Sequence, residues 1–367
     1  MRLLLACTVS AAVVLSAPFM GRLQTFLRAS ISTRAYVVLL GVAVGASVLT
    51  AIVVAFTRIT AHRARRIAAM AAAIALAVAY TGMLSTGIAE IDAVERVHFV
   101  EYGLIAVLFY RVWRRAGDAS TIVLPILCGF IVGTLDEWLQ WFIPYRVGEM
   151  HDVLLNFTSL VCGVLFGFAL EPPPSFSWRP DADGWSRIGR GTAAAVLVFG
   201  GFVGVVHLGQ VLHVEGLGQF ASRHTVAELD ALQRDRAEQW LTAPPLNIPR
   251  LSREDQYLDE GLWHVRERNN RWDDGDITAA WHENLILERF FAPVLDRSTY
   301  VSVNGNRWPA EHRADAQSRA VPDPAFVSQA ESYPILAWSK PLYWLLVVVA
   351  ALLCAGLPML NRRSRPL

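Results

Sequence analysis

Ionisable side chains stand at helical spacing on an apolar stretch of the chain, where they could recognise a charged or hydrogen-bonding ligand. Glu95, His98 and Tyr102 follow one another at i, i+3 and i+7, so they share one face of a predicted helix. A charged group at the centre of a bilayer costs about 3 kcal/mol on insertion scales. Polar residues in such a segment are therefore candidates for function.

Two further polar groups come later, each on its own apolar run. Asp136, Glu137 and Gln140 lie near the end of one run and precede Arg146. The third group begins the next run, in which Asp152, Asn156, Ser159 and Gly163 follow at spacings of four, three and four residues. This spacing predicts a polar stripe along one helix face.

The three polar groups are expected to converge. They occupy the start of one predicted helix, the end of the next and the start of the third, and these ends lie on the same side of a membrane. Gly129 with Gly133, and Gly163 with Gly167, are small residues four apart that would let the helices approach closely.

The chemistry of this cluster favours ligand binding. Arg146 is the expected anion anchor, because a guanidinium matches phosphate with two hydrogen bonds. Glu137 and Asp152 would orient Arg146 and accept hydrogen bonds from sugar or peptide groups. The predicted ligand-binding residues are His98, Glu101, Tyr102, Asp136, Glu137, Gln140, Arg146, Asp152 and Asn156. No catalytic residue, metal ligand or cofactor is assigned.

Eight apolar runs are long enough to predict membrane-spanning helices. They lie near residues 3–20, 36–56, 67–89, 99–113, 121–143, 153–170, 192–212 and 342–360. The first also resembles a signal peptide, although Pro18 disfavours cleavage after Ala17. Arginines cluster in every second connection, for example Arg63 to Arg66 and Arg111 to Arg115, so these connections are expected to face the cytoplasm.

By this alternation residues 213–338 lie outside the cytoplasm. They hold 13 Arg against 20 Asp and Glu, a net charge of −7, so an acidic, water-exposed domain is expected. Thr225 and Glu228 form a capping box before a helix through Trp240, and two more helices are predicted at 252–269 and 278–291. Asn304-Gly305 predicts a β-hairpin within 300–308, and the segment after Glu311 is expected to be loop.

The composition of the chain argues against several classes of protein. With 54% hydrophobic and 18% charged residues, the chain is neither disordered nor collagen-like, and an ordinary soluble enzyme is disfavoured. The four cysteines all lie in apolar runs, which offers no disulfide framework and no cysteine-based zinc site. No stripe of Lys and Arg with interleaved aromatics is present, so nucleic acid is not an expected partner.

The segment from Asp92 to Leu170 resembles the VanZ family of bacterial membrane proteins. The motif residues, in order, are His98 and Tyr102; Asp136, Glu137, Gln140, Pro144 and Arg146; and Asp152, Asn156 and Gly163. Two positions depart from the family pattern: Glu95 stands where Lys is frequent, and Ser159 where Gly is frequent.

The resemblance implies a place in the cell envelope and no particular reaction. Founding members of the family are accessory proteins associated with tolerance of teicoplanin, a lipid-tailed glycopeptide. The expected partner is a membrane lipid or lipid-linked envelope precursor, held at the outer leaflet of the bacterial cytoplasmic membrane. An envelope protein or glycan could bind the outer domain. Six tryptophans lie within this domain or at its membrane-proximal end.

Three alternatives remain open from the sequence. The polar cluster could be a hydrogen-bonded network that only locks three helices in register. It could serve a metal-assisted or acid/base hydrolase, although no HExxH or GxSxG signature is present. The outer domain could be a scaffold that docks proteins.

The predicted fold class is therefore an all-α, multi-pass helical membrane bundle with a small, mainly helical extracytoplasmic domain that contains one β-hairpin. The expected divisions are 1–35 for an N-terminal span or signal-like segment, 36–172 for the VanZ-like membrane domain, 173–191 for a cytoplasmic loop, 192–212 for a span, 213–338 for the outer domain and 341–361 for the last span.

Overall fold

The computed structural model describes residues 1–143, 148, 150–242, 253–297, 306–330 and 334–362. The chain divides into two compact units. The first, which we call the bundle unit, comprises Met1–Gln140, Val147–Phe202 and Leu345–Leu367. The second, the acidic unit, comprises Trp141–Arg146 and Val203–Trp344. The structure is 76% helical, which confirms the predicted, mainly helical fold class.

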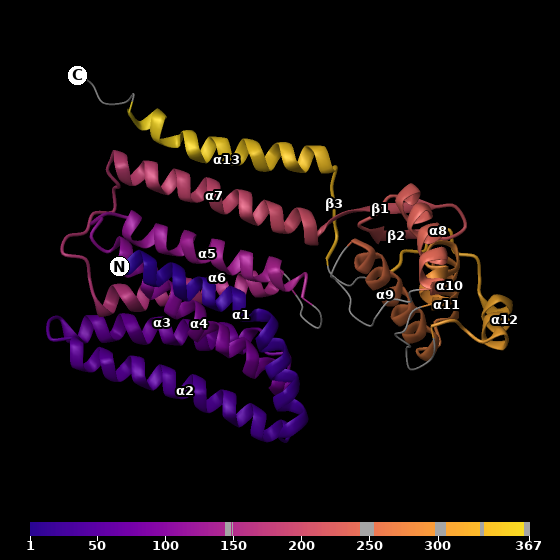
Figure 1. Ribbon diagram of the computed structural model, residues 1–367, viewed down its shortest axis with the longest axis horizontal. Coiled ribbons are helices and arrows are strands. Elements are labelled where there is room, and N and C mark those ends of the chain that lie inside the picture. The colour runs from indigo at the N-terminus through magenta and orange to yellow at the C-terminus, as the bar shows by residue number, and fades with distance from the viewer. Residues whose placement is uncertain (144–147, 149, 243–252, 298–305, 331–333, 363–367) are drawn as a thin grey trace. The chain divides into compact units, whose positions relative to one another are not determined.

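Among the described residues, a helix forms at each of the eight predicted apolar runs, and the helices of the bundle unit lie side by side (Figure 1). They are α1 (Arg2–Ser30), α2 (Thr33–Arg58), α3 (Arg63–Met83), α4 (Ala89–Trp113), α5 (Ser120–Gln140), α6 (Met150–Leu170), α7 (Ala182–Val206) and α13 (Lys340–Arg362).

Six of these described helices, all except α4 and α13, are long and apolar enough to cross a membrane. The described apolar part of α13 is shorter, covering Lys340–Gly356. Helix α4 carries several charged side chains in its first half, among them Asp92, Glu95, Arg96 and Glu101. The protein is a membrane protein, and α4 brings several charged side chains into its helical bundle.

Helix α4 is the centre of the bundle unit, since it packs against α1, α2, α5 and α6. Its buried face combines Tyr102, Ile105, Ala106 and Phe109 with Leu160 of α6. Apolar side chains on the second half of α4 therefore hold the neighbouring helices, while its first half presents polar groups to the same neighbours.

Glycines permit the close packing of α4, α5 and α6, as predicted. A Cβ atom at Gly163 of α6 would lie 2.5 Å from the backbone oxygen of Gly103 on α4. A Cβ atom at Gly129 of α5 would overlap the side chain of Leu160 on α6. Because backbone cannot move aside as a flexible side chain can, the α4–α6 contact requires glycine at 163.

We predict that Gly163→Ala destabilises the protein by roughly 1–3 kcal/mol, since the added methyl group forces α4 and α6 apart. Gly45→Ala is the matched control, because within the described chain nothing lies within 4 Å of a Cβ atom at Gly45 on α2. Alanine in a helix interior is favoured over glycine, so this control should keep or raise stability. Thermal unfolding in detergent measures both; equal midpoints for the two variants would contradict the packing argument.

The acidic unit combines a small sheet with helices. Strands β1 (Leu208–Val214) and β2 (Gly218–Ser222) form an antiparallel hairpin, and β3 (Leu336–Ala337) pairs in parallel with β1, which gives the order β2-β1-β3. The helices are α8 (Val226–Thr242), α9 (Arg253–Asp273), α10 (Ile277–Phe290), α11 (Ala292–Arg297) and α12 (Ala310–Arg319).

The core of the acidic unit lies between the hairpin and helices α8 to α11. Phe220 of β2 packs with Leu229 of α8, Tyr257 of α9 and Phe290 of α10, and all four are almost completely buried. Helix α8 starts at the predicted capping box: the Thr225 N–H donates to Glu228 Oε2 at 2.9 Å, and the Glu228 N–H donates to Thr225 Oγ1 at 3.1 Å.

Two expectations about secondary structure were wrong. A membrane-spanning helix was predicted at 192–212. The helix of this segment, α7, ends at Val206, and the residues from Leu208 to Val214 form strand β1 instead. Gly216 and Gly218, with φ of 77° and 97°, adopt the left-handed conformations that let the chain reverse into β2. Apolarity alone could not separate the helix from the buried strand that follows it.

The segment after Glu311 was expected to be loop, but Ala310–Arg319 forms helix α12. Its apolar content is low, and among the described residues of α12 only Ala316 is buried, so hydrophobic periodicity gave no signal. The hairpin predicted at Asn304-Gly305 lies outside the described residues.

Candidate functional site

The predicted polar groups of α4, α5 and α6 come together at one end of these three helices, in the bundle unit. The Tyr102 hydroxyl donates to Asp136 Oδ2 at 2.8 Å. The side-chain amide of Gln140 donates to Asp136 Oδ2 at 2.9 Å and to Glu137 Oε1 at 3.2 Å. Tyr102 of α4 is thus linked through Asp136 to Gln140, and Gln140 in turn to Glu137, all within about one turn of α5.

Asn156 of α6 closes the connection back to α4. Its amide nitrogen donates to Glu137 Oε1 at 3.4 Å, and its amide oxygen lies 3.0 Å from Nδ1 of His98. An amide oxygen only accepts hydrogen bonds, so Nδ1 of His98 carries the proton. The rings of His98 and Tyr102 are stacked, with their centroids 6.1 Å apart.

We call these six side chains the polar cluster; its members are His98, Tyr102, Asp136, Glu137, Gln140 and Asn156. Glu137 is completely buried, and Asp136 is 5% exposed. Gly133 allows this approach, because a Cβ atom there would lie 3.2 Å from both Tyr102 and Asn156. The cluster thus places two adjacent carboxylates within a membrane protein and supplies hydrogen-bond donors from three helices.

The remaining predicted site residues lie around the polar cluster or outside the described chain. Glu101 is half-buried on α4. His151 and Asp152 begin α6, are partly exposed, and pair at 3.4 Å. Arg146, the predicted anion anchor, lies outside the described residues, as does Pro144. The described part of the site is therefore rich in acceptors and acidic groups.

Two further carboxylates on α4, Glu95 and Asp92, were not assigned to the site from the sequence. Glu95 is buried and stands one turn before His98 on the same face. Asp92 accepts hydrogen bonds from Ser85 Oγ at 2.5 Å and from the Thr86 N–H at 2.9 Å. Asp92 therefore fastens the preceding loop to α4, whereas Glu95 extends the polar face toward the cluster.

Ser159 contributes less than the predicted polar stripe implied. Its hydroxyl donates to the backbone oxygen of Leu155 in its own helix, at 2.8 Å. A serine at this position is thus satisfied locally, and Asn156 is the residue of α6 that reaches both neighbouring helices.

The opposite ends of the same helices are held by arginines. Arg66 donates to the backbone oxygens of Ala169 and Leu170, at 2.7 and 2.5 Å, at the carboxyl end of α6. Arg111 and Arg114 pair with Glu171 at 2.8 and 3.2 Å. Cations at this helix end complement its dipole and fix α3, α4 and α6 in register, so the polar cluster at the far end is held in place.

No group of three or more His, Cys, Asp or Glu in the described part of the chain is arranged to hold a metal ion. The cluster contains two carboxylates and one imidazole, and the imidazole contacts an amide. The described geometry is that of a hydrogen-bonding site.

Comparison with known proteins agrees with this architecture. Residues 54–171 match the family model VanZ/LLP1. This segment is a VanZ-like domain. It begins near the end of α2, contains α3 to α6 and ends at Glu171, so the polar cluster and its arginine-held far end lie within it. No curated protein and no solved structure matches the chain.

We predict that Asn156→Ala costs roughly 1–3 kcal/mol of folding free energy, because it removes a donor from the buried Glu137 and an acceptor from His98. Thr158→Ala is the matched control on α6, since the Thr158 hydroxyl donates only within its own helix, to Leu154 at 3.0 Å. Thermal unfolding in detergent compares the two. A loss no larger for Asn156→Ala than for Thr158→Ala would show that the cluster does not hold the helices together.

Proposed function

We propose that the VanZ-like domain binds the headgroup of a lipid-linked or lipid-tailed molecule of the bacterial envelope, at the polar cluster. The observation that carries the proposal is the buried pair Asp136 and Glu137, joined through side chains of α4 and α6 and bordered by partly exposed Asp152 and His151. Hydrogen-bond acceptors thus extend from the interior of the bundle to its surface.

The charge of the cluster defines the ligand chemistry. Its described carboxylates accept hydrogen bonds, so they suit hydroxyl or amino groups on a sugar or peptide. Arg146, three residues after Ile143, supplies a guanidinium close in sequence to α5, suited to a phosphate or carboxylate. A headgroup that combines an anion with several hydrogen-bond donors, as in a lipid-linked sugar or peptide, meets both requirements.

The membrane orientation supports an outer-leaflet site. Arg66, Arg111 and Arg114 gather at the end of the helices opposite the polar cluster, and positive loops remain on the cytoplasmic side. We therefore assign the cluster to the outer leaflet of the cytoplasmic membrane and residues 213–338 to the outside. The association of the family with tolerance of a lipid-tailed glycopeptide is in keeping with this placement.

Arg146→Ala is expected to abolish retention of an anionic lipid while the protein still inserts into the membrane. Arg115→Ala is the matched control, because Arg115 is exposed in the connection between α4 and α5, at the opposite helix ends. Native mass spectrometry of protein purified from bacterial membranes detects the bound species. A lipid adduct of equal abundance in wild type and Arg146→Ala would overturn the role of Arg146, and a bare protein in every sample would favour a purely structural cluster.

Glu137→Gln separates binding from folding. The amide has nearly the same shape and keeps an oxygen acceptor, so the fold should survive, while the loss of negative charge should weaken ligand retention by about tenfold. Lipid occupancy is measured by native mass spectrometry, and stability by the thermal unfolding midpoint, for wild type and Glu137→Gln. If Glu137→Gln lowers the midpoint as strongly as Asn156→Ala but leaves occupancy unchanged, the carboxylate acts in stability alone.

A further inference from the structure

A groove in the acidic unit has the dimensions of a ligand site and is separate from the membrane cluster. Its volume is about 760 Å³, which lies within the range of roughly 300–1,000 Å³ found for small-molecule sites. The β1–β2 turn forms one rim, and residues 320–324 after α12 form another. Helices α10 and α12 contribute Trp281 and Gln317.

His282 of α10 holds both rims in place. Its Nδ1 lies 3.0 Å from the backbone oxygen of Leu217 in the turn, and its Nε2 accepts the Asp323 N–H at 3.4 Å. The ring also stacks on Phe326, with centroids 4.7 Å apart. Because the Leu217 oxygen only accepts, His282 is the tautomer with hydrogen on Nδ1, and one buried imidazole spans the base of the groove.

Glycine completes the turn on the same side. Gly218 has φ of 97°, and a Cβ atom there would lie 2.5 Å from the backbone oxygen of Phe326. The Gln219 N–H donates to that same oxygen at 2.8 Å. The turn and the segment after α12 are therefore packed directly on each other, so the groove exists before a ligand arrives and binding does not have to order it.

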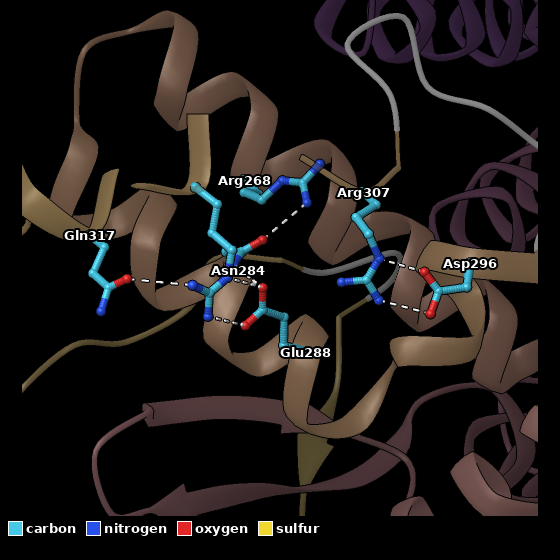
Figure 2. Close-up of polar contacts among 7 residues, drawn as sticks. Arg268, Asn284, Glu288, Asp296, Arg307 and Gln317 are labelled. Carbon is cyan, nitrogen blue, oxygen red and sulfur yellow. Dashed lines mark hydrogen bonds and ion pairs between the residues drawn. The ribbon is translucent and has the colours of Figure 1, made fainter. Parts of the chain in front are cut away.

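Helix α12 is fixed to α10 through a charged link (Figure 2). Arg313 donates to the Glu288 carboxylate from Nε and Nη2, at 2.7 and 2.9 Å, and its Nη1 donates to Gln317 Oε1 at 3.4 Å. Its partners Glu288 and Gln317 are labelled in Figure 2. Hydrogen bonding from Arg313 holds the pKa of Glu288 below its usual value, so the pair stays ionised at neutral pH. Since Gln317 Oε1 accepts from Arg313, its amide nitrogen is the group available as a donor in the groove wall.

The lining combines an aromatic ring with acceptors and amides. Trp281 is half-buried, Glu215 and Asp323 supply carboxylates, and Gln219 and Gln317 supply amides. Among the described residues that line the groove, none is Lys or Arg. Arg313 lies close to the lining, with its guanidinium 5.3 Å from the centre of the Trp281 ring, but it is paired with Glu288. The two lining carboxylates therefore disfavour phosphates, nucleotides and other anions.

We propose that this groove binds an oligosaccharide of neutral or amino sugars. The apolar C–H face of a pyranose ring packs on an indole ring, and its equatorial hydroxyls donate to carboxylates and amide oxygens and accept from amide N–H groups. An amino sugar adds a cation that the two carboxylates favour. The proposal does not depend on the lipid site, since every residue that carries it lies in the acidic unit.

Isothermal titration of the full chain in detergent tests the proposal with three probes of matched length. These are the β-1,4-linked tetramer of N-acetylglucosamine, its deacetylated glucosamine form, and tetragalacturonate, which is anionic. Saturable binding is expected for one or both of the first two, and none for the third. Glu215→Gln and Gln317→Ala should each weaken affinity about tenfold, the loss of roughly one hydrogen bond.

The variants avoid the core, because Glu215 and Gln317 are exposed. Glu238→Gln on α8 and Ser318→Ala on α12 are matched controls on exposed positions outside the groove lining, and they should bind as wild type does. The proposal is overturned if neither neutral nor amino oligosaccharide binds, if tetragalacturonate binds as well, or if both groove variants keep wild-type affinity. A lysine-rich peptide that binds where the sugars fail would identify the groove as a peptide site instead.

Discussion

The burial of Asp136 and Glu137 is the constraint on which the bundle unit depends. Two adjacent carboxylates on an apolar helix are tolerated only with donors close by, and these come from Tyr102 on α4 and Asn156 on α6, with Gln140 on α5 itself. Each donor fixes the rotation of its own helix about the helix axis and the position of that helix along the axis. Glycine at 163 then brings α4 and α6 close enough for the bonds to form.

The same bundle is held differently at its two ends. Arginines pair with Glu171 and the terminal carbonyls of α6 at one end. At the other end the acceptors of the polar cluster lead to partly exposed His151 and Asp152. The first arrangement is that of a structural clamp. The second leaves His151 and Asp152 partly exposed to the surroundings, which is why we propose ligand binding at this end.

The convergence of the polar groups on α4, α5 and α6 was more predictable from the sequence than the fold of the acidic unit. Helical spacing places His98 and Tyr102 on one face, and alternation of spans brings the end of α5 beside the starts of α4 and α6. These rules are local, so residue types and intervals were enough. These rules did not predict the contact of Ser159. Its hydroxyl donates within its own helix, and residue spacing does not show whether a serine bonds within its helix or across to a neighbour.

The acidic unit depends on contacts between distant parts of the chain. Strand β1 follows α7 with one residue between them, and its apolar residues extend the apolar run of the helix, so only its pairing with β2 and β3 distinguishes it. Helix α12 is held by Arg313 on Glu288, which is 25 residues away in sequence. His282 likewise joins the β1–β2 turn to Asp323, and no periodicity marks such a residue. The groove was therefore visible only in three dimensions.

The most direct test of the central claim is a cryo-electron microscopy map of the protein in nanodiscs made from bacterial membrane lipids. Our account predicts density for a lipid headgroup against His98, Asp152 and Arg146, with its acyl or polyprenyl chain running along α5 or α6. A well-ordered map in which the side chains of α4, α5 and α6 fill this region, with bulk lipid alone outside it, would contradict the assignment and leave the polar cluster as a lock between helices.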